Sequence, residues 1–166
     1  MIQTCGNADS EAIFQVINDA AHAYRGVIPQ DRWQEPYMGR AELQREIDAG
    51  VCFSGIRRGT ALVAVMGIQV VKDVTLIRHA YTATGCQGRG LGGQLLSHLH
   101  GQAGTPVLVG TWADAVWAVR FYQQRGFQLS RPEDTGALLE KYWDIPRRQV
   151  ETSVVLSDVP VAGLLA

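Results

Sequence analysis

Four glycines within six residues constrain the fold of this chain more than any other feature of its sequence. The segment Gly88-Arg89-Gly90-Leu91-Gly92-Gly93 follows a β-branched run at 74–84 and precedes an apolar helix face formed by Leu95, Leu96 and Leu99. Glycine lets consecutive backbone N–H groups turn inward without a Cβ clash, and the N-terminus of the following helix adds partial positive charge. The segment therefore predicts a strand–turn–helix unit that binds an anion such as a diphosphate, with Arg89 adding a direct charge.

The runs around this turn predict a mixed sheet. Three β-branched or aromatic-rich runs, at 51–57, 62–71 and 74–84, are separated by the hairpin signals Arg58-Gly59 and Lys72-Asp73, so they predict an antiparallel meander. The other predicted strands are at 1–5, 106–111, 127–129 and 150–156. Helices are predicted at 11–23, 40–49 and 114–125, after the glycine turn with an end near Gly101 and Gly104, and from Pro132. The fold class is thus α/β (α+β), with a mixed, mostly antiparallel central sheet of about six or seven strands flanked by about four or five helices.

The composition argues against several other classes of protein. The 166 residues carry a net charge of −1 and are 46% hydrophobic, which fits one domain over 1–166, with a core at about 1–157 and a short C-terminal tail. The even charge argues against a nucleic-acid binder, and no apolar run reaches the roughly 18 residues of a membrane span. No signal peptide is evident, and Cys5, Cys52 and Cys86 form no CxxC pair, so we expect a metal-free protein of the cytoplasm.

Two common diphosphate-binding motifs fit the glycine turn less well. No Gly-Lys-Ser or Gly-Lys-Thr follows it, which excludes the Walker A motif. Gly88, Gly90 and Gly93 do match the GxGxxG fingerprint of dinucleotide-binding folds. That fingerprint normally follows the first strand of a parallel sheet, whereas antiparallel strands precede it here. A dinucleotide-dependent oxidoreductase is therefore an alternative that the context disfavours.

Two motifs, in order, resemble those of the GCN5-related N-acetyltransferases. The stretch Gln87-Gly88-Arg89-Gly90-Leu91-Gly92 is similar to the family's phosphate loop, Gln/Arg-x-x-Gly-x-Gly/Ala, and a leucine-rich helix follows it. The family's Ala-x-x-Phe-Tyr-x-x-x-Gly-Phe segment is similar to Ala118-Val119-Arg120-Phe121-Tyr122-Gln123-Gln124-Arg125-Gly126-Phe127. The resemblance covers nearly the whole chain, because the order of the predicted elements also fits.

The resemblance implies an enzyme that binds acetyl-CoA and passes its acetyl group directly to a primary amine. Backbone N–H groups of the glycine turn would hold the diphosphate, and the preceding strand would pair with the pantetheine arm, with an amide near Thr82 facing the thioester carbonyl. The cofactor would enter a gap between that strand and the strand at 107–111. The residues implied in cofactor binding are Ala80, Tyr81, Thr82, Gln87, Gly88, Arg89, Gly90, Leu91, Gly92, Gly93, Ala118 and Phe121.

The catalytic residues implied are Tyr122 and His79. Tyr122 matches the family tyrosine that protonates the departing thiolate, and a phenol of pKa about 10 suits that role. The strand at 74–84 departs from the family pattern, since it has no Glu or Asp where some members place a general base. His79 has suitable chemistry, directly or through a water, and can equally be a structural histidine. Strict alternation places His79 and Tyr81 on one face of the strand and Arg78, Ala80 and Thr82 on the other.

The acceptor side would be covered by the segment 24–38. Its aromatic and charged residues predict either a small-molecule pocket or a packed loop; they are Tyr24, Arg25, Trp33, Glu35 and Tyr37. Glu35 would steer a cationic amine and Arg25 would bind a carboxylate, so small-molecule and peptide acceptors both stay open. A non-catalytic CoA-binding module is a further alternative. A homodimer is the commonest assembly to expect.

Overall fold

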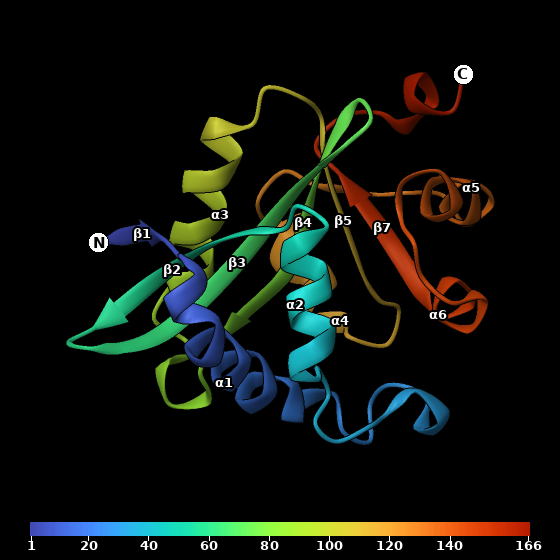
Figure 1. The fold of residues 1–166 in the computed structure, drawn as a ribbon. Helices are drawn as coiled ribbons and strands as arrows, with labels where there is room; N and C mark the ends of the chain where they lie inside the picture. Colours follow the sequence, from blue (N-terminus) through green and yellow to red (C-terminus); the bar gives the residue numbers. More distant parts are fainter.

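The computed structural model describes residues 1–166 and contains one seven-stranded sheet (Figure 1). Its strands are β1 (Ile2–Thr4), β2 (Cys52–Arg58), β3 (Ala61–Val71), β4 (Val74–Thr82), β5 (Val107–Trp112), β6 (Gln128–Leu129) and β7 (Ser153–Ser157). The α-helices are α1 (Ser10–Ala21), α2 (Arg40–Asp48), α3 (Leu91–Gln102), α4 (Val116–Gln123), α5 (Pro132–Tyr142) and α6 (Arg147–Glu151). The strand order is β1-β2-β3-β4-β5-β7-β6, with only β4 and β5 parallel.

The predicted meander is confirmed. β2 pairs antiparallel with β3, and β3 pairs antiparallel with β4. Gly59 and Lys72 lie in the two connecting turns with φ of 60° and 53°. Positive φ angles match the right-handed twist of the flanking strands in tight hairpins. The sequence therefore encodes this half of the sheet through its turns as much as through its strands.

The sheet opens between its two central strands. The crossover through α3 places β5 beside β4, but the two strands pair only where Thr75–Ile77 meets Val107–Val109. Beyond this point β4 runs on to Thr82 and β5 to Trp112 without pairing with each other. The predicted gap is therefore present. This mostly antiparallel sheet is also not the doubly wound parallel sheet that the dinucleotide alternative requires.

Helices cover both faces of the sheet. α3 and α4 pack on one face, where Val107 and Val109 of β5 join their hydrophobic cluster. Leu108, between them, points to the opposite face and joins the cluster that includes residues of α5. α1 and α2 cover that same opposite face farther along, over β2 and β3 (Figure 1). Period-two alternation along the strands thus supplies both cores.

The C-terminal half differs in detail from the sequence prediction. The structure has six α-helices, whereas about four or five were expected, because residues 147–151 form α6. Pro146 directly precedes α6, where its fixed φ favours the start of a helix. The last strand therefore begins at Ser153 instead of residue 150. α4 likewise begins at Val116, two residues later than the predicted 114.

The segment after β7 is docked instead of trailing as a tail. Leu164 is only 7% exposed and packs in the cluster that holds Leu138 and Leu139 of α5. The ammonium group of Lys141 donates to the carbonyl oxygen of Leu164. The residues beyond about 157 are therefore part of the core, whereas the sequence predicted a core that ends at about residue 157.

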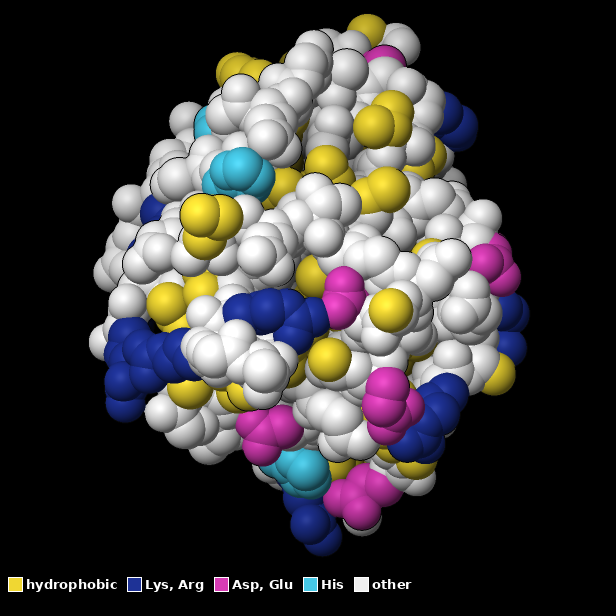
Figure 2. All heavy atoms as spheres, turned by 60° about the vertical axis from the view of Figure 1, so that its left-hand side comes forward, with side chains coloured by type: hydrophobic (Ala, Val, Ile, Leu, Met, Phe, Trp, Pro, Cys, Tyr) yellow, Lys and Arg dark blue, Asp and Glu magenta, His cyan; other side chains and the backbone are white.

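One face of the molecule carries charged side chains of both signs. On the face shown in Figure 2, Lys and Arg side chains are interspersed with Asp and Glu, in keeping with the net charge of −1. None of the helices combines the length and the hydrophobicity that a membrane crossing requires.

Candidate active site

A cleft of about 660 Å³ lies against the end of β4, and no residue of β5 lines it. β4 and the glycine turn form one side of this cleft, and α4 forms the other. Arg89 is exposed and does not line it. The other residues implied in cofactor binding all do: Ala80, Tyr81, Thr82, Gln87, Gly88, Gly90, Leu91, Gly92, Gly93, Ala118 and Phe121.

The glycine turn presents an uninterrupted set of hydrogen-bond donors. Gly88 and Gly90 adopt φ of 73° and 76°, a conformation that residues with a Cβ rarely adopt. The consecutive backbone N–H groups from Gly88 to Gly93 have no hydrogen-bond acceptor within the protein. Leu91, Gly92 and Gly93 also form the first turn of α3, where the helix dipole favours negative charge. The turn therefore suits a diphosphate.

Arg125 adds a fixed positive charge that the sequence analysis missed. One of its terminal nitrogens, Nη1, donates to the carbonyl oxygen of Phe121 at 3.0 Å, and its guanidinium carbon lies 4.0 Å from the centre of the Phe121 ring. Its side chain also reaches the glycine turn, since a Cβ built on Gly93 would lie 2.8 Å from Arg125 Nη2. Arg125 lies within the second motif, but nothing in the motif indicated that its side chain turns back toward the first.

β4 offers a free backbone donor to the cleft. The N–H of Ala83 donates to the carbonyl of Val63 in β3 at 2.8 Å. Backbone groups alternate in direction along an antiparallel strand, so the N–H of Thr82 faces away from β3 and toward the opening. Gln87 Nε2 donates to the Thr82 carbonyl at 3.1 Å and fixes the junction between β4 and the turn.

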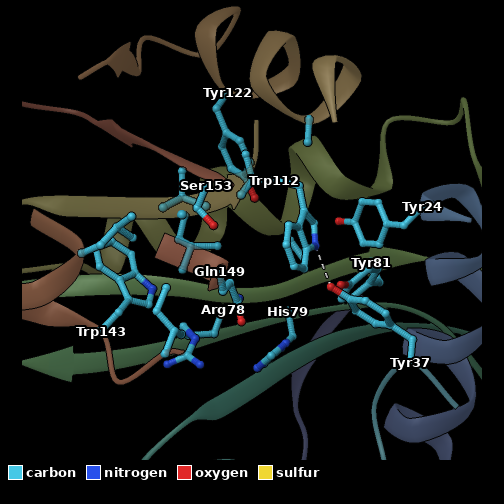
Figure 3. A pocket seen from close by; sticks show the side chains of 18 residues that line it. Tyr24, Tyr37, Arg78, His79, Tyr81, Trp112, Tyr122, Trp143, Gln149 and Ser153 are labelled. Atoms are coloured by element: carbon cyan, nitrogen blue, oxygen red, sulfur yellow. Dashed lines mark hydrogen bonds between the residues drawn. The ribbon is translucent and has the colours of Figure 1, made fainter. Parts of the chain in front are cut away.

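A smaller side cavity of about 140 Å³ adjoins the cleft (Figure 3). In Figure 3, Trp143 of the segment after α5 lies at one end of this cavity, and Tyr24 and Tyr37 lie at the other. The two spaces are adjacent, because they share five wall residues: Tyr24, Ala80, Tyr81, Ala118 and Tyr122.

Tyr122 lies at this junction. It projects from α4, is only 4% exposed and packs edge-on against Phe121 and Phe127. Its hydroxyl has no hydrogen-bond partner in the protein, so it is free to serve a group in either space. Burial raises the pKa of Tyr122, which keeps the phenol protonated at neutral pH.

Three more tyrosines close one end of the side cavity. The Trp112 indole N–H donates to the Tyr37 hydroxyl at 2.7 Å. The ring centre of Tyr24 lies 5.4 Å from that of Tyr37 and 6.2 Å from that of Tyr81. Burial raises the pKa of all three tyrosines, so this end of the cavity carries phenols and no phenolates.

Arg78 and His79 of β4 lie at the lower side of the cavity in Figure 3, and both contact Glu46 of α2. His79 Nε2 lies 2.9 Å from Glu46 Oε2, and Arg78 Nη2 donates to both Glu46 oxygens at 2.9 and 3.0 Å. Burial acts to raise the pKa of Glu46, but hydrogen bonding and positive charge from His79 and Arg78 outweigh it and lower that pKa. Because an ionised carboxylate only accepts, Nε2 of His79 carries a hydrogen, and in the neutral form of the ring Nδ1 holds the free lone pair.

A β-bulge explains why Arg78 and His79 reach the same carboxylate. The β3–β4 register shifts between Val65 and Gly67, and His79 adopts φ of 53°. The bulge interrupts alternation, so the prediction that Arg78 faces away from His79 is wrong. Tyr81 and His79 do face the same side, since both pack against the cluster beneath α1 and α2. Gly67 permits the bulge because a Cβ there would lie 2.9 Å from the Arg78 carbonyl oxygen.

Only two of the five predicted acceptor-binding residues in segment 24–38 line the side cavity. Tyr24 and Tyr37 line the side cavity. Trp33 stacks on Tyr37 from outside, with ring centres 5.9 Å apart. Arg25 and Glu35 lie at the surface, 3.7 Å apart, so the structure pairs these charges with each other instead of placing them at the cavity.

Comparison with known protein families matches part of this chain to one family. Residues 49–129 match the model of the acetyltransferase (GNAT) domain. This stretch contains the glycine turn, the opening between β4 and β5, and Tyr122. The chain is therefore an acyltransferase by class. Residues 49–129 are a GNAT domain, as the two motifs indicated.

Solved structures support the fold at low sequence identity. The PaiA N-acetyltransferase of Thermoplasma acidophilum, solved with coenzyme A, is 14% identical, with a TM-score of 0.72 over 96% of this chain and 98% of that one. A GNAT-family acetyltransferase of Staphylococcus aureus Mu50 is 14% identical, with a TM-score of 0.68 over 95% and 96%. The ribosomal-protein-S18-alanine N-acetyltransferase of Escherichia coli is 17% identical, with a TM-score of 0.62 over 95% and 91%. No curated protein sequence matches the chain.

Proposed function

We propose that this protein is an acetyl-CoA-dependent N-acetyltransferase that acts on a primary amine. The observation that carries the proposal is that two adjacent spaces share Tyr122, whose hydroxyl has no partner in the protein. One space is a cleft with a row of free backbone donors, and the other is a smaller cavity lined mostly by hydrophobic residues. A bound thioester and an amine, one in each space, would come together at this junction.

The cleft has the donor set that a CoA diphosphate needs. The free N–H groups of Gly88 to Gly93 would hold the phosphate oxygens, and Arg125 would add positive charge beside them. The N–H of Thr82 would stabilise negative charge on a carbonyl oxygen held along β4. When bound, acetyl-CoA supplies an acetyl thioester whose C–S bond breaks as the amine forms its C–N bond.

Tyr122 would donate its hydroxyl proton to the leaving sulfur. Its raised pKa keeps the proton in place until a basic group accepts it. His79 would take the other proton, the one that the ammonium must lose before its nitrogen can attack. Nδ1 of His79 is the free acceptor for this step because Glu46 holds Nε2. Glu46 thereby orients the ring and stabilises the charged imidazole that forms.

The compartment proposed for this reaction is the cytoplasm. Cys5, Cys52 and Cys86 are all free thiols. Free cysteines are typical of a reducing compartment, which supports that location.

The test is an acetyl-CoA-dependent thiol-release assay on a broad panel of amines, with the acetylated product identified by mass spectrometry. The panel would include arylalkylamines, amino acids, polyamines and peptides with a free N-terminus. We expect stoichiometric thiol release and N-acetyl product with at least one class. Binding of acetyl-CoA without transfer to any panel member would contradict the proposal and favour a non-catalytic CoA-binding module.

A further inference from the structure

We infer that the acceptor is a compact primary monoamine with an apolar, ring-sized body and with neither a carboxylate nor a second ammonium group. This inference rests on the proposed function and names its substrate class. It is drawn from the size, the wall chemistry and the charge balance of the side cavity.

The size of the cavity limits the body of the acceptor. Its volume is about 140 Å³. An apolar protein cavity of about 150 Å³ holds one benzene molecule. The cavity therefore accommodates a single ring or a short branched alkyl group. A peptide acceptor would place only a terminal side chain in it.

The walls favour an aromatic or aliphatic body. Rings surround the space on several sides in Figure 3, with Trp112 in the centre, Trp143 at one end and Tyr24 and Tyr37 at the other. Tyr37 is fixed by its hydrogen bond from Trp112, so this part of the wall is preorganised. Aromatic faces pack well against apolar groups and attract a single ammonium through cation–π contact.

The charges at the wall cancel each other. Arg78 is the one permanently charged residue that lines the cavity, and both its terminal nitrogens are engaged, with Glu46 and with Gln69 Oε1 at 2.9 Å. No free cation is left for an acceptor carboxylate. No Asp or Glu lines the cavity, so no free anion is left for a second ammonium. A group of either charge would be buried without a partner, which is strongly unfavourable.

Two neutral polar groups allow one uncharged substituent. The side-chain amide of Gln149 and the hydroxyl of Ser153 line the cavity, and neither has a hydrogen-bond partner in the protein. In Figure 3 both lie away from the three tyrosines. A hydroxyl or amide on the far side of the acceptor's ring would satisfy them, whereas a charged group would not.

The experiment compares three amines that share one skeleton, by the thiol-release assay on the full chain. Phenethylamine is the reference, phenylalanine adds a carboxylate, and para-(aminomethyl)phenethylamine adds a second amine. We expect kcat/KM for phenethylamine to exceed that for each charged analogue by more than about tenfold. A kcat/KM for either analogue that equals or exceeds the reference overturns the inference.

A charge introduced into the wall tests the argument from the protein side. Gln149→Glu supplies the missing anion, so kcat/KM for the diamine should rise at least about tenfold relative to phenethylamine. Gln102→Glu adds the same charge at an exposed position on α3 and should leave that ratio unchanged. An unchanged ratio in Gln149→Glu overturns the charge argument, as does an equal rise in both variants.

The outcomes separate this inference from the proposed function. Transfer to glutamate, spermidine or a peptide, with none to phenethylamine, overturns the monoamine inference and leaves the acetyltransferase intact. No transfer to any amine of the broad panel, with acetyl-CoA bound, overturns the acetyltransferase itself.

Discussion

The hydroxyl of Tyr122 is the group on which the chemistry depends most. It is buried at the junction of the two spaces and has no partner in the protein. Tyr122→Phe should lower kcat by about 10²-fold, the loss typical of one missing acid catalyst, with little change in KM for acetyl-CoA. Steady-state kinetics with single-turnover controls would measure it.

Tyr142→Phe is a matched control for this substitution. The Tyr142 hydroxyl donates to Asp73 Oδ1 at 2.8 Å, away from both spaces. Its loss should lower the free energy of unfolding by about 1 kcal/mol and leave kcat unchanged. If both phenylalanine variants lowered kcat alike, or neither did, Tyr122 would not be the acid.

Glu46 gives a prediction for the pH dependence of stability. Its pKa is lower in the folded protein than in the unfolded chain, so the stabilisation it provides is present above the ordinary carboxyl range and is lost as pH falls through the folded pKa. Glu46→Gln should therefore reduce the free energy of unfolding by about 2 kcal/mol near pH 7. The difference from wild type should shrink as the pH approaches about 4.

Urea unfolding at several pH values would check this, with the exposed Glu140→Gln on α5 as control. A difference for Glu46→Gln that stays constant down to acid pH would show that the carboxylate is not held ionised by Arg78 and His79.

At the scale of residues, the glycine turn could be predicted from the sequence, whereas the cluster of Glu46, Arg78 and His79 could not. The motif around Tyr122 and the glycines could be read directly, because their neighbours in sequence are also their neighbours in space. Glu46 lies 33 positions before His79, on another element, and only the docking of α2 on β4 brings the two together. The bulge at His79 broke the alternation from which the position of Arg78 was predicted.

At the scale of elements, the turn before α3 makes a prediction that separates binding from strain. Gly90 has φ of 76° at the N-terminus of α3, and its neighbours supply the free N–H groups. Gly90→Ala should destabilise the protein by about 1 kcal/mol and, by shifting these donors, raise the Kd for acetyl-CoA about tenfold. Calorimetric titration would measure the affinity, and thermal unfolding the stability.

Gly59→Ala is the control, because Gly59 has φ of 60° in the β2–β3 turn and an added Cβ would meet nothing within 4 Å. Gly59→Ala should lower the stability by a similar amount without weakening the binding of acetyl-CoA. Equal affinities for both variants and wild type would argue that the turn before α3 does not bind the ligand.

The elements themselves were predictable where pattern and turn chemistry agreed. The meander from β2 to β4 had both β-branched runs and hairpin turns, and it was predicted almost residue for residue. The region from 144 to 157 was harder, because Val150 sits in a short helix beside a strand of similar composition. Only Pro146 indicates that a helix begins there.

At the scale of the whole molecule, the C-terminal segment is part of the core. Leu164 packs with Val74 of β4 and Leu138 of α5, so it ties the end of the chain to the strand that lines the site. Leu164→Ala should lower the free energy of unfolding by about 2–3 kcal/mol, as expected for a cavity in a packed cluster. Urea denaturation would measure it, and a change below about 0.5 kcal/mol would mean that the segment is not docked in solution.

The general architecture followed from the sequence, whereas the shape of the acceptor space did not. The order of strands and helices and the glycine turn point to one fold, and the opening between β4 and β5 follows from that order. The side cavity combines residues of β4, β5, β7, α6 and the segment after α1. Such a space depends on how distant elements pack, so Gln149 and Ser153 carried no local signal of their role.

The central claim is that the cleft holds acetyl-CoA, and calorimetric titration of the full chain tests it most directly, with NADH titrated in parallel. The account predicts saturable binding of acetyl-CoA at one site per chain and no heat from NADH. Binding of NADH without acetyl-CoA would contradict it and revive the dinucleotide alternative. Absence of binding by both would mean that the glycine turn serves the fold alone.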